Sequence, residues 1–173
     1  SEIQAVHKTY LRGRAMVATG SVVALFTVDR REAPMKQSEQ INAIAGKGIE
    51  GDRYLLETGT YSKKPEPGRQ VTLIQSEVLD SLKTKFDITV KPEESRRNVL
   101  TKGIEINDLI GTEFFVGPVR LQAHRLTRPC LYLEKLLSQP GLYNELWENG
   151  GISCEILSGG VIKEGDVITA ATD

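Results

Sequence analysis

Cysteine and histidine are scarce in this sequence. Its 173 residues include two cysteines, Cys130 and Cys154, and two histidines, His7 and His124. Two cysteines are too few for a disulfide framework or a cysteine-rich zinc site, and two histidines cannot build a histidine-rich metal site. We assign no role to His7. The sequence also lacks a Walker loop, a dinucleotide-binding fingerprint and a metallohydrolase histidine pattern. These absences leave the thiols as the reactive groups of interest.

Long hydrophobic runs and an excess of one charge are absent as well. No apolar run reaches the roughly 18–20 residues that span a bilayer, and residues 1–14 lack the apolar core of a signal peptide. The 22 basic and 23 acidic residues leave a net charge of −1, which argues against nucleic acid or a membrane as partner. We therefore expect a cytoplasmic protein, in a reducing compartment where cysteine stays a free thiol.

The pattern of apolar residues indicates one mainly-β domain. Neither an internal repeat nor a long linker divides the chain, so we expect a single domain over residues 1–173. Short β-branched stretches bounded by glycine and proline predict strands, with a hairpin at Gly117-Pro118 and short helices between them. This pattern favours a β-barrel or β-sandwich with a few helices. The expected strands are 16–28, 71–75, 113–126, 152–157 and 161–170, the last interrupted by a turn at 165–166; the expected helices are 76–85, capped by Ser76, 141–149 and one beginning at Pro129; residues 30–40 are expected to form a loop.

Cys130 lies in a basic stretch. Residues 117–133 contain neither Asp nor Glu. A nearby arginine or protonated histidine lowers the pKa of a thiol, and Pro129 places Cys130 near a predicted helix start, where main-chain N–H groups favour an anion. Cys130 is therefore the candidate catalytic residue, although a free cysteine is also commonly a small buried hydrophobic residue. The basic residues of this stretch are Arg120, His124, Arg125 and Arg128.

Cys154 and His124 are interpreted as structural residues. Cys154 lies in the alternating stretch 152–157, which predicts a packed strand residue. A redox pair of Cys154 with Cys130 is the alternative, and it requires the two Cα atoms to lie within about 7 Å of each other. His124 falls in the predicted hairpin, where a structural role is commoner than catalysis.

Two further motifs suit an anion. In the segment 48–54 (GIEGDRY) the glycines permit a sharp turn, Asp52 can accept main-chain N–H bonds, and Arg53 is then left to point outward. The segment 94–103 (ESRRNVLTKG) suits phosphate, because a guanidinium binds phosphate through paired hydrogen bonds. The alternative for each motif is an ordinary turn. The anion-binding candidates are Arg53, Arg96, Arg97, Asn98 and Thr101, with Arg69 in the same group.

The order and spacing of these motifs resemble the MOSC domain, the family named for the C-terminal domain of molybdenum cofactor sulfurases. The resemblance covers roughly residues 14–171 and implies a single stand-alone MOSC domain. It implies a strand-rich, barrel-like fold and a positively charged pocket around one cysteine. In the family this cysteine either carries sulfur as a persulfide or ligates molybdenum through its thiolate. The segments that carry the resemblance are 48–53, 69–74, 96–103, Cys130, 150–157 and 162–167.

The resemblance also implies roles for individual residues. Cys130 becomes the sulfur carrier or the molybdenum ligand. Arg53, Arg97 and Asn98 become candidates for holding the phosphate of a molybdopterin-type cofactor or for positioning the ligand loop. Tyr54 stands where many members have histidine; it can donate a hydrogen bond but cannot replace histidine as a proton shuttle, so no proton delivery is expected there. Further cofactor-binding candidates are Asp52, Arg69, Arg96, Thr101 and Arg128.

Three functions remain open at this point. The first is a molybdenum-cofactor protein in which Cys130 ligates the metal and which reduces N-hydroxylated compounds with electrons from an external reductase. The second is a sulfur carrier whose Cys130 persulfide comes from a cysteine desulfurase, with pyridoxal phosphate bound to that partner. The third is a non-catalytic module that binds an anionic ligand. The sequence does not fix the oligomeric state.

Overall fold

The structure is a computed structural model that describes residues 16–30, 33–56, 67–128 and 142–172. The predicted helix beginning at Pro129, and Cys130 with it, lie outside the described residues. The remaining predicted elements can be compared with the structure one by one.

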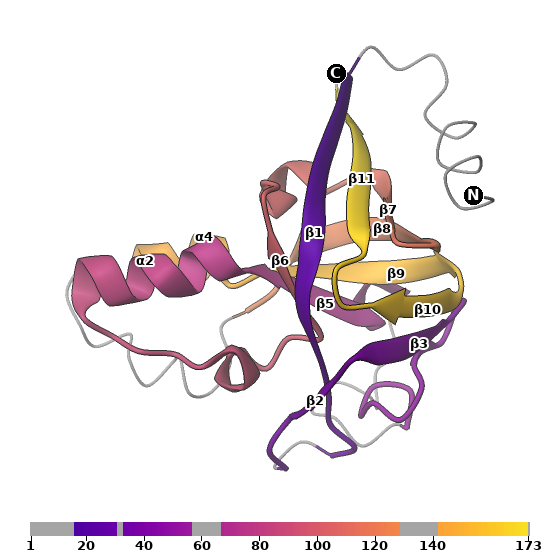
Figure 1. Cartoon of the computed structure of the whole chain (residues 1–173), viewed down its shortest axis with the longest axis horizontal. Coiled ribbons are helices and arrows are strands. Elements are labelled where there is room, and N and C mark those ends of the chain that lie inside the picture. Colours follow the sequence, from indigo (N-terminus) through magenta and orange to yellow (C-terminus); the bar gives the residue numbers. More distant parts are fainter. Residues whose placement is uncertain (1–15, 31–32, 57–66, 129–141, 173) are drawn as a thin grey trace.

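A closed barrel of seven strands forms the centre of the protein (Figure 1). Six pairings join the seven strands in one continuous order, and a seventh pairing, of the first strand with the last, closes the ring. This confirms the prediction of a mainly-β, barrel-like fold. In ring order the strands are β11 (Val167–Thr172), β7 (Glu113–Val116), β8 (Val119–Leu126), β9 (Ile152–Ser158), β5 (Val71–Gln75), β6 (Val99–Lys102) and β1 (Met16–Thr27).

The alternating pattern of side chains explains how these strands close on a core. Along β8, Val119, Leu121 and Ala123 are buried, whereas Arg120 and Gln122 between them are partly exposed. Every second residue of a strand points to the same face, so the apolar set of each strand meets inside the ring. Buried side chains of the other strands join the same cluster, among them Leu73, Val99, Phe114, Ile152, Cys154 and Ile168.

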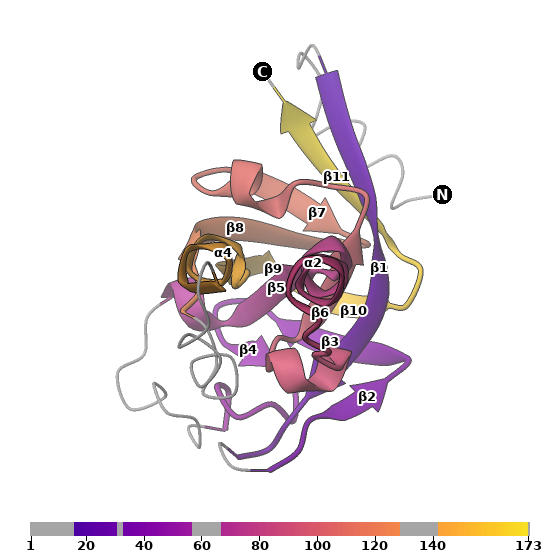
Figure 2. The same cartoon turned by 90° about the vertical axis from the view of Figure 1, so that its left-hand side faces the viewer.

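Two α-helices cover one side of the barrel in the part of the chain described. They are α2 (Ser76–Phe86) and α4 (Leu142–Asn149), and they lie next to each other beside β5 and β6 (Figures 1 and 2). Both predicted helices are confirmed. A second apolar cluster joins the helices to the outer face of the sheet; it includes Ala24, Ile74, Leu79, Leu82, Leu100, Leu142 and Leu146.

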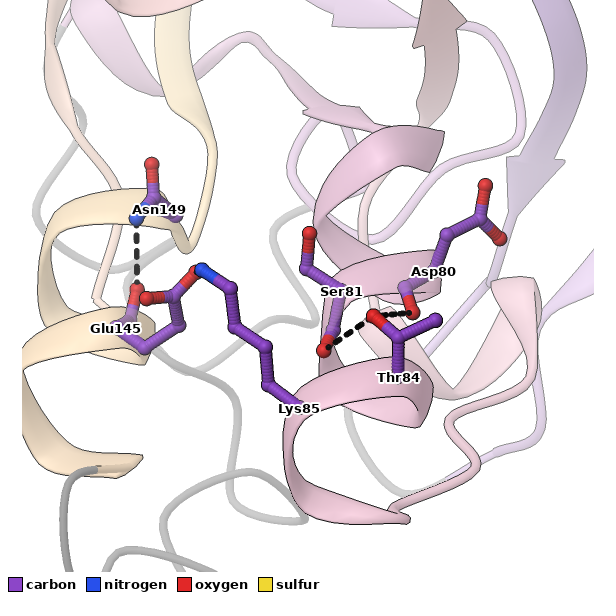
Figure 3. Close-up of polar contacts among 6 residues, drawn as sticks. All are labelled: Asp80, Ser81, Thr84, Lys85, Glu145 and Asn149. Carbon is purple, nitrogen blue, oxygen red and sulfur yellow. Dashed lines mark hydrogen bonds and ion pairs between the residues drawn. The ribbon is translucent and has the colours of Figure 1, made fainter.

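Polar contacts also connect the two helices. The Lys85 ammonium lies 3.6 Å from the Glu145 carboxylate, and Figure 3 shows the Lys85 side chain extending from α2 toward α4. The prediction that Ser76 caps α2 is wrong. The cap position is Gln75, and its side chain makes no capping bond because its Oε1 accepts the main-chain N–H of Ile106 instead.

Short segments extend the barrel. β2 (Lys36–Ser38) pairs with β1, and a small sheet joins β10 (Gly160–Lys163), β3 (Gln40–Ile44) and β4 (Gly48–Ile49). The prediction of a loop over residues 30–40 is therefore wrong at its end. β2 is polar and largely exposed, so it shows no apolar alternation in the sequence. The 3₁₀ helices are η1 (Pro67–Arg69), η2 (Pro92–Ser95) and η3 (Ile106–Leu109). No helix in the described ranges is long and apolar enough to cross a membrane.

Candidate functional site

Most of the predicted site residues come together in one group of connecting segments. We call the group the loop cluster and define it as residues 51–54, 96–98, 127–128 and 150–151. These segments flank β4, β6, β8 and β9, and hydrogen bonds join each of them to another member or to the end of β1. The cluster is therefore assembled from parts of the chain that lie far apart in sequence.

Arg97 links two of these segments. Its side chain is 6% exposed, and its Nε donates to the carbonyl oxygen of Gly150 at 2.8 Å. One terminal nitrogen of the same guanidinium donates to the carbonyl oxygen of Arg128. The Thr127 hydroxyl donates to the Gly150 oxygen as well, at 2.7 Å. Arg97 thus connects the segment after β8 to the segment before β9. The contact after β8 is made at Arg128, two residues before Cys130.

Gly151 makes this close approach possible. Its φ is +107°, a conformation that side-chain-bearing residues rarely adopt. A Cβ atom built there would lie 2.2 Å from the carbonyl oxygen of Leu73 and 3.3 Å from the Nε of Arg97. Sequence reasoning did not single out Thr127 or Gly151 as site residues. The signal for Gly151 was its position in a Gly-Gly pair directly before a predicted strand.

Asp52 is buried in the loop cluster, with 3% of its surface exposed. Its Oδ1 accepts the main-chain N–H of Val28 at 3.0 Å, and the Arg53 N–H donates to the Val28 oxygen at 2.6 Å. Burial raises the pKa of Asp52, while the Val28 N–H, the Arg53 charge, the Asn98 side chain and the Tyr54 N–H act against that rise. The carboxyl group therefore fixes the turn, as the sequence suggested.

Asn98 uses its amide for contacts within the protein. Its Oδ1 accepts from the main-chain N–H and the hydroxyl of Thr72, at 3.1 and 3.2 Å. Its Nδ2 donates to the Phe26 oxygen at 3.2 Å, and its side chain also bonds Asp52. An amide side chain has two donor hydrogens and two acceptor lone pairs. These four contacts fill that capacity, so the structure favours a positioning role for Asn98 over direct phosphate contact.

Arg53 and Arg96 meet at the half-buried surface of the cluster. A terminal nitrogen of Arg53 donates to the Arg96 carbonyl oxygen at 3.4 Å. Arg96 itself has a φ of +64°, and its guanidinium donates to the carbonyl oxygen of Ala33 at 2.6 Å. A left-handed backbone at a residue with a side chain is uncommon and clusters at functional sites. Here it occurs at the residue whose carbonyl oxygen accepts the Arg53 guanidinium.

The remaining predicted residues are less closely associated. Thr101 is fully buried in β6, and its hydroxyl donates to the Ile74 oxygen at 3.3 Å. Arg69 ends η1, a helix that packs on β8 and β9. The Arg128 side chain is exposed directly after β8. Of these three residues, Arg128 alone belongs to the loop cluster as defined above.

The acid-free stretch around β8 obtains acidic partners from neighbouring strands. Arg120 pairs with Glu113 of β7, and His124 Nε2 lies 3.0 Å from Glu155 Oε1 of β9. Cross-strand pairing therefore neutralises part of the charge that the linear sequence leaves unopposed. Arg120 also lies at the opposite end of β8 from Arg128, so the basic stretch does not form one continuous pocket.

Cys154 is a packed strand residue, as predicted. It is fully buried in the barrel core, and burial strongly raises the pKa of its thiol. The proposed redox pair with Cys130 remains a prediction, because Cys130 lies outside the described residues. Among the residues described, no group of three or more His, Cys, Asp or Glu side chains could hold a metal ion.

Comparison with known proteins decides the family. The model of the MOSC domain family matches residues 60–169, which is more than half of the chain. The protein belongs to the MOSC domain family. The match includes Arg69, the 96–103 segment and the Gly150-Gly151 pair. No curated protein matches this MOSC sequence at a significant level.

Solved structures share the fold of this MOSC protein. The YuaD protein from Bacillus subtilis is 20% identical, with a TM-score of 0.68 over 89% of this chain and 96% of that one. YiiM from Geobacillus stearothermophilus is 13% identical, with a TM-score of 0.63 over 87% of this chain and 75% of that one. YiiM from Escherichia coli is 16% identical, with a TM-score of 0.58 over 91% and 71%. At such identities the likeness establishes the fold.

Proposed function

We propose that this MOSC protein binds a molybdopterin-type cofactor and that the Cys130 thiolate ligates the molybdenum. The observation that carries the proposal is the Arg97 clamp. A buried guanidinium holds the carbonyl oxygens of Arg128 and Gly150, so the main chain leading to Cys130 starts from a fixed point. Precise placement of a ligand needs such support from residues that do not themselves bind the metal.

The loop cluster also suits the anionic part of such a cofactor. The Arg53 guanidinium contacts the main chain of Arg96 at its half-buried surface, and Arg128 adds an exposed side chain two residues before Cys130. Guanidinium groups match phosphate in charge and geometry. A thiolate is also a soft ligand that suits molybdenum held by the sulfurs of a dithiolene. The residues present therefore fit the group.

The bound metal would supply two-electron redox chemistry, of the kind that reduces N-hydroxylated compounds. The chain's own residues would then orient the cofactor: Arg97 by fixing the ligand segment, and Arg53 with Arg96 by holding the phosphate. Electrons would come from a separate reductase.

Metal analysis tests the proposal. Protein purified from a host that makes the cofactor is expected to contain about one molybdenum atom per chain, because one thiolate completes one site. Cys130→Ala is expected to lose the metal. Cys154→Ala is the matched control, since it removes a thiol from the barrel core, and it should retain the metal. Molybdenum that is absent from the parent protein, or retained by Cys130→Ala, contradicts the proposal.

The sulfur-carrier function is the second candidate. The exposed Arg128 side chain favours it, because a site that receives sulfur from another protein must be reachable from solvent. A desulfurase persulfide would transfer its outer sulfur to the Cys130 thiolate, leaving a desulfurase thiolate and a Cys130 persulfide. Mass spectrometry after incubation with a cysteine desulfurase and cysteine should then show one added sulfur on Cys130. If neither metal nor sulfur is found and Cys130→Ser keeps its ligand, a non-catalytic anion-binding module is left.

A further inference from the structure

Two side chains of the loop cluster, Asp52 and Asn98, bond each other, and each also bonds the main chain near the end of β1. Asp52 bonds the N–H of Val28, and Asn98 bonds the oxygen of Phe26. Both partners belong to the end of β1 and the residue after it. The pair therefore joins the 51–54 turn and the 96–98 segment to one common strand.

We propose that Asp52 and Asn98 form a buried positioning pair that makes Arg53 and Arg96 bind one phosphate-type anion as a unit. The proposal rests on the anion-binding part of the proposed function and assigns a role to residues that do not touch the ligand. Asn98 has no hydrogen-bonding capacity left for an anion, and Asp52 carries the same charge sign as the anion. Both residues act through the two arginines.

The geometry of the arginines supports this role. Arg53 follows Asp52 directly, and its N–H bond to Val28 fixes the start of its side chain. Arg96 lies two residues before Asn98, in the left-handed conformation that turns its carbonyl oxygen toward the Arg53 guanidinium. Rotating either segment would break the contact between the Arg53 guanidinium and the Arg96 carbonyl oxygen. An anion held by both arginines needs both segments in place, so the positioning pair controls affinity.

A buried carboxylate at this position is costly unless it is well paired. Burial is the largest influence on Asp52 and opposes its ionised form. A buried ion pair is weak evidence for stability, because the cost of desolvation often offsets the gain from pairing. The carboxylate is therefore better explained by what it positions than by what it adds to stability.

The test is a double-mutant cycle with inorganic phosphate as probe. All variants carry Cys130→Ala, so that the result does not depend on molybdenum or persulfide. Binding is followed by the chemical shifts of the main-chain amides at positions 53 and 96 during phosphate titration, and folding by the urea midpoint. We expect Arg53→Gln and Asp52→Asn each to weaken phosphate binding about tenfold. The double variant should bind no more weakly than Arg53→Gln alone, since Asp52 acts through Arg53.

Two further variants make the outcome decisive. Asp87→Asn removes an exposed aspartate that pairs with Lys83 on α2, and it should leave phosphate affinity unchanged. Thr72→Val removes the hydroxyl bonded to Asn98 but keeps Asp52 and both arginines, and it should weaken phosphate binding by about threefold. If Asp52→Asn does not fold, the phosphate affinity of Thr72→Val tests the proposal instead.

The proposal is overturned if the parent chain does not bind phosphate, if Asp52→Asn and Thr72→Val bind as the parent does, or if the losses from Asp52→Asn and Arg53→Gln add. A purely structural Asp52 would lower the urea midpoint and give additive losses. Failure of the molybdenum proposal would be seen separately. The protein with Cys130 intact would then lack the metal, while the effects of Asp52→Asn and Arg53→Gln on phosphate binding would still be non-additive.

Discussion

Gly151 shows how closely the chain packs in the loop cluster. Because Gly151 has no side chain, the main chain just before β9 can pack against the Leu73 carbonyl oxygen. In this position the Gly150 oxygen accepts a hydrogen bond from the Arg97 guanidinium. The contact depends on one residue type at one position, because any Cβ atom would overlap main-chain oxygen rather than a movable side chain.

We expect Gly151→Ala to lower the free energy of unfolding by about 3 kcal/mol, from steric overlap and from the positive φ together. Gly165→Ala is the matched control. Gly165 has a φ of +84°, and a methyl group added there would have nothing within 4 Å, so this variant isolates the backbone strain, about 1 kcal/mol. Urea unfolding measures both, and equal losses would contradict the role of the Leu73 contact.

Asp52 gives a prediction for pH dependence. Because burial raises its pKa, the folded protein binds the Asp52 proton more tightly than the unfolded chain does. The stabilisation from that proton is present at pH values below the ordinary aspartate range and is lost as the pH rises through the folded-state pKa. The free energy of unfolding of the parent, minus that of Asp52→Asn, should therefore fall with rising pH and then level off.

Asp87 should behave in the opposite way. A hydrogen bond from Lys83 lowers the pKa of this exposed carboxyl group. Its contribution is present above the ordinary aspartate range and is lost as the pH falls through its folded-state pKa. Urea unfolding over a pH series, with Asp87→Asn as the second variant, distinguishes the two signs. A rising difference for Asp52 would show that its burial does not dominate.

At the scale of elements, α2 and α4 illustrate which contacts hold a helix to the barrel. Leu142 and Leu146 of α4 are at most 1% exposed and pack in the outer apolar cluster. The ion pair between Lys85 and Glu145 lies closer to solvent, with side chains 59% and 24% exposed. Buried apolar contacts should therefore dominate the attachment of α4, because solvent screens exposed charges.

Leu146→Ala is expected to lower the free energy of unfolding by about 2–5 kcal/mol through lost burial and the cavity left behind. Glu145→Gln, one residue away, should change it by less than about 0.5 kcal/mol. Thermal or urea unfolding of the two variants measures the difference. A larger effect from Glu145→Gln would mean that the ion pair, and not the apolar cluster, holds the helix.

At the scale of the whole molecule, pairing of β1 with β11 closes the barrel around one core. Six residue pairs join these strands, and they come from opposite ends of the chain. Cys154 lies inside the ring with no exposed surface. Its thiol can reach a reagent in solution only when the barrel opens.

In the Cys130→Ala chain, Cys154 should be unreactive toward a thiol reagent under native conditions and react fully in denaturant. Its labelling rate should rise in parallel with the unfolded population, because local fraying does not expose the centre of a closed barrel. Labelling measured against urea concentration, beside an optical unfolding curve, tests this. Rapid labelling of the native chain would show that the barrel opens locally at β9.

Local patterns in the sequence were enough for most of the elements. Apolar periodicity and turn residues predicted strands over 16–28 and 71–75, a hairpin around Gly117-Pro118 and helices over 76–85 and 141–149. The structure has the corresponding elements β1, β5, β7, β8, α2 and α4, the last described from Leu142. β2 was not predicted because its residues are polar. Its strand conformation comes from pairing with β1. The Ser76 cap failed because a tertiary contact of Gln75 with Ile106 replaced it.

The candidate site could also be predicted from the sequence only in part. The sequence by itself determined which residue types are available: Cys130, the arginines, Asp52 and Asn98, in an order that matches the MOSC family. Only the tertiary structure decided their roles. It engaged the side chains of Asn98 and Thr101 in bonds within the protein, paired Arg120 and His124 with acids from other strands, and turned Arg97 toward the main chain. The reason is physical: a residue's type sets how many hydrogen bonds and charges it offers, but its partners come from distant segments that meet only when the barrel closes.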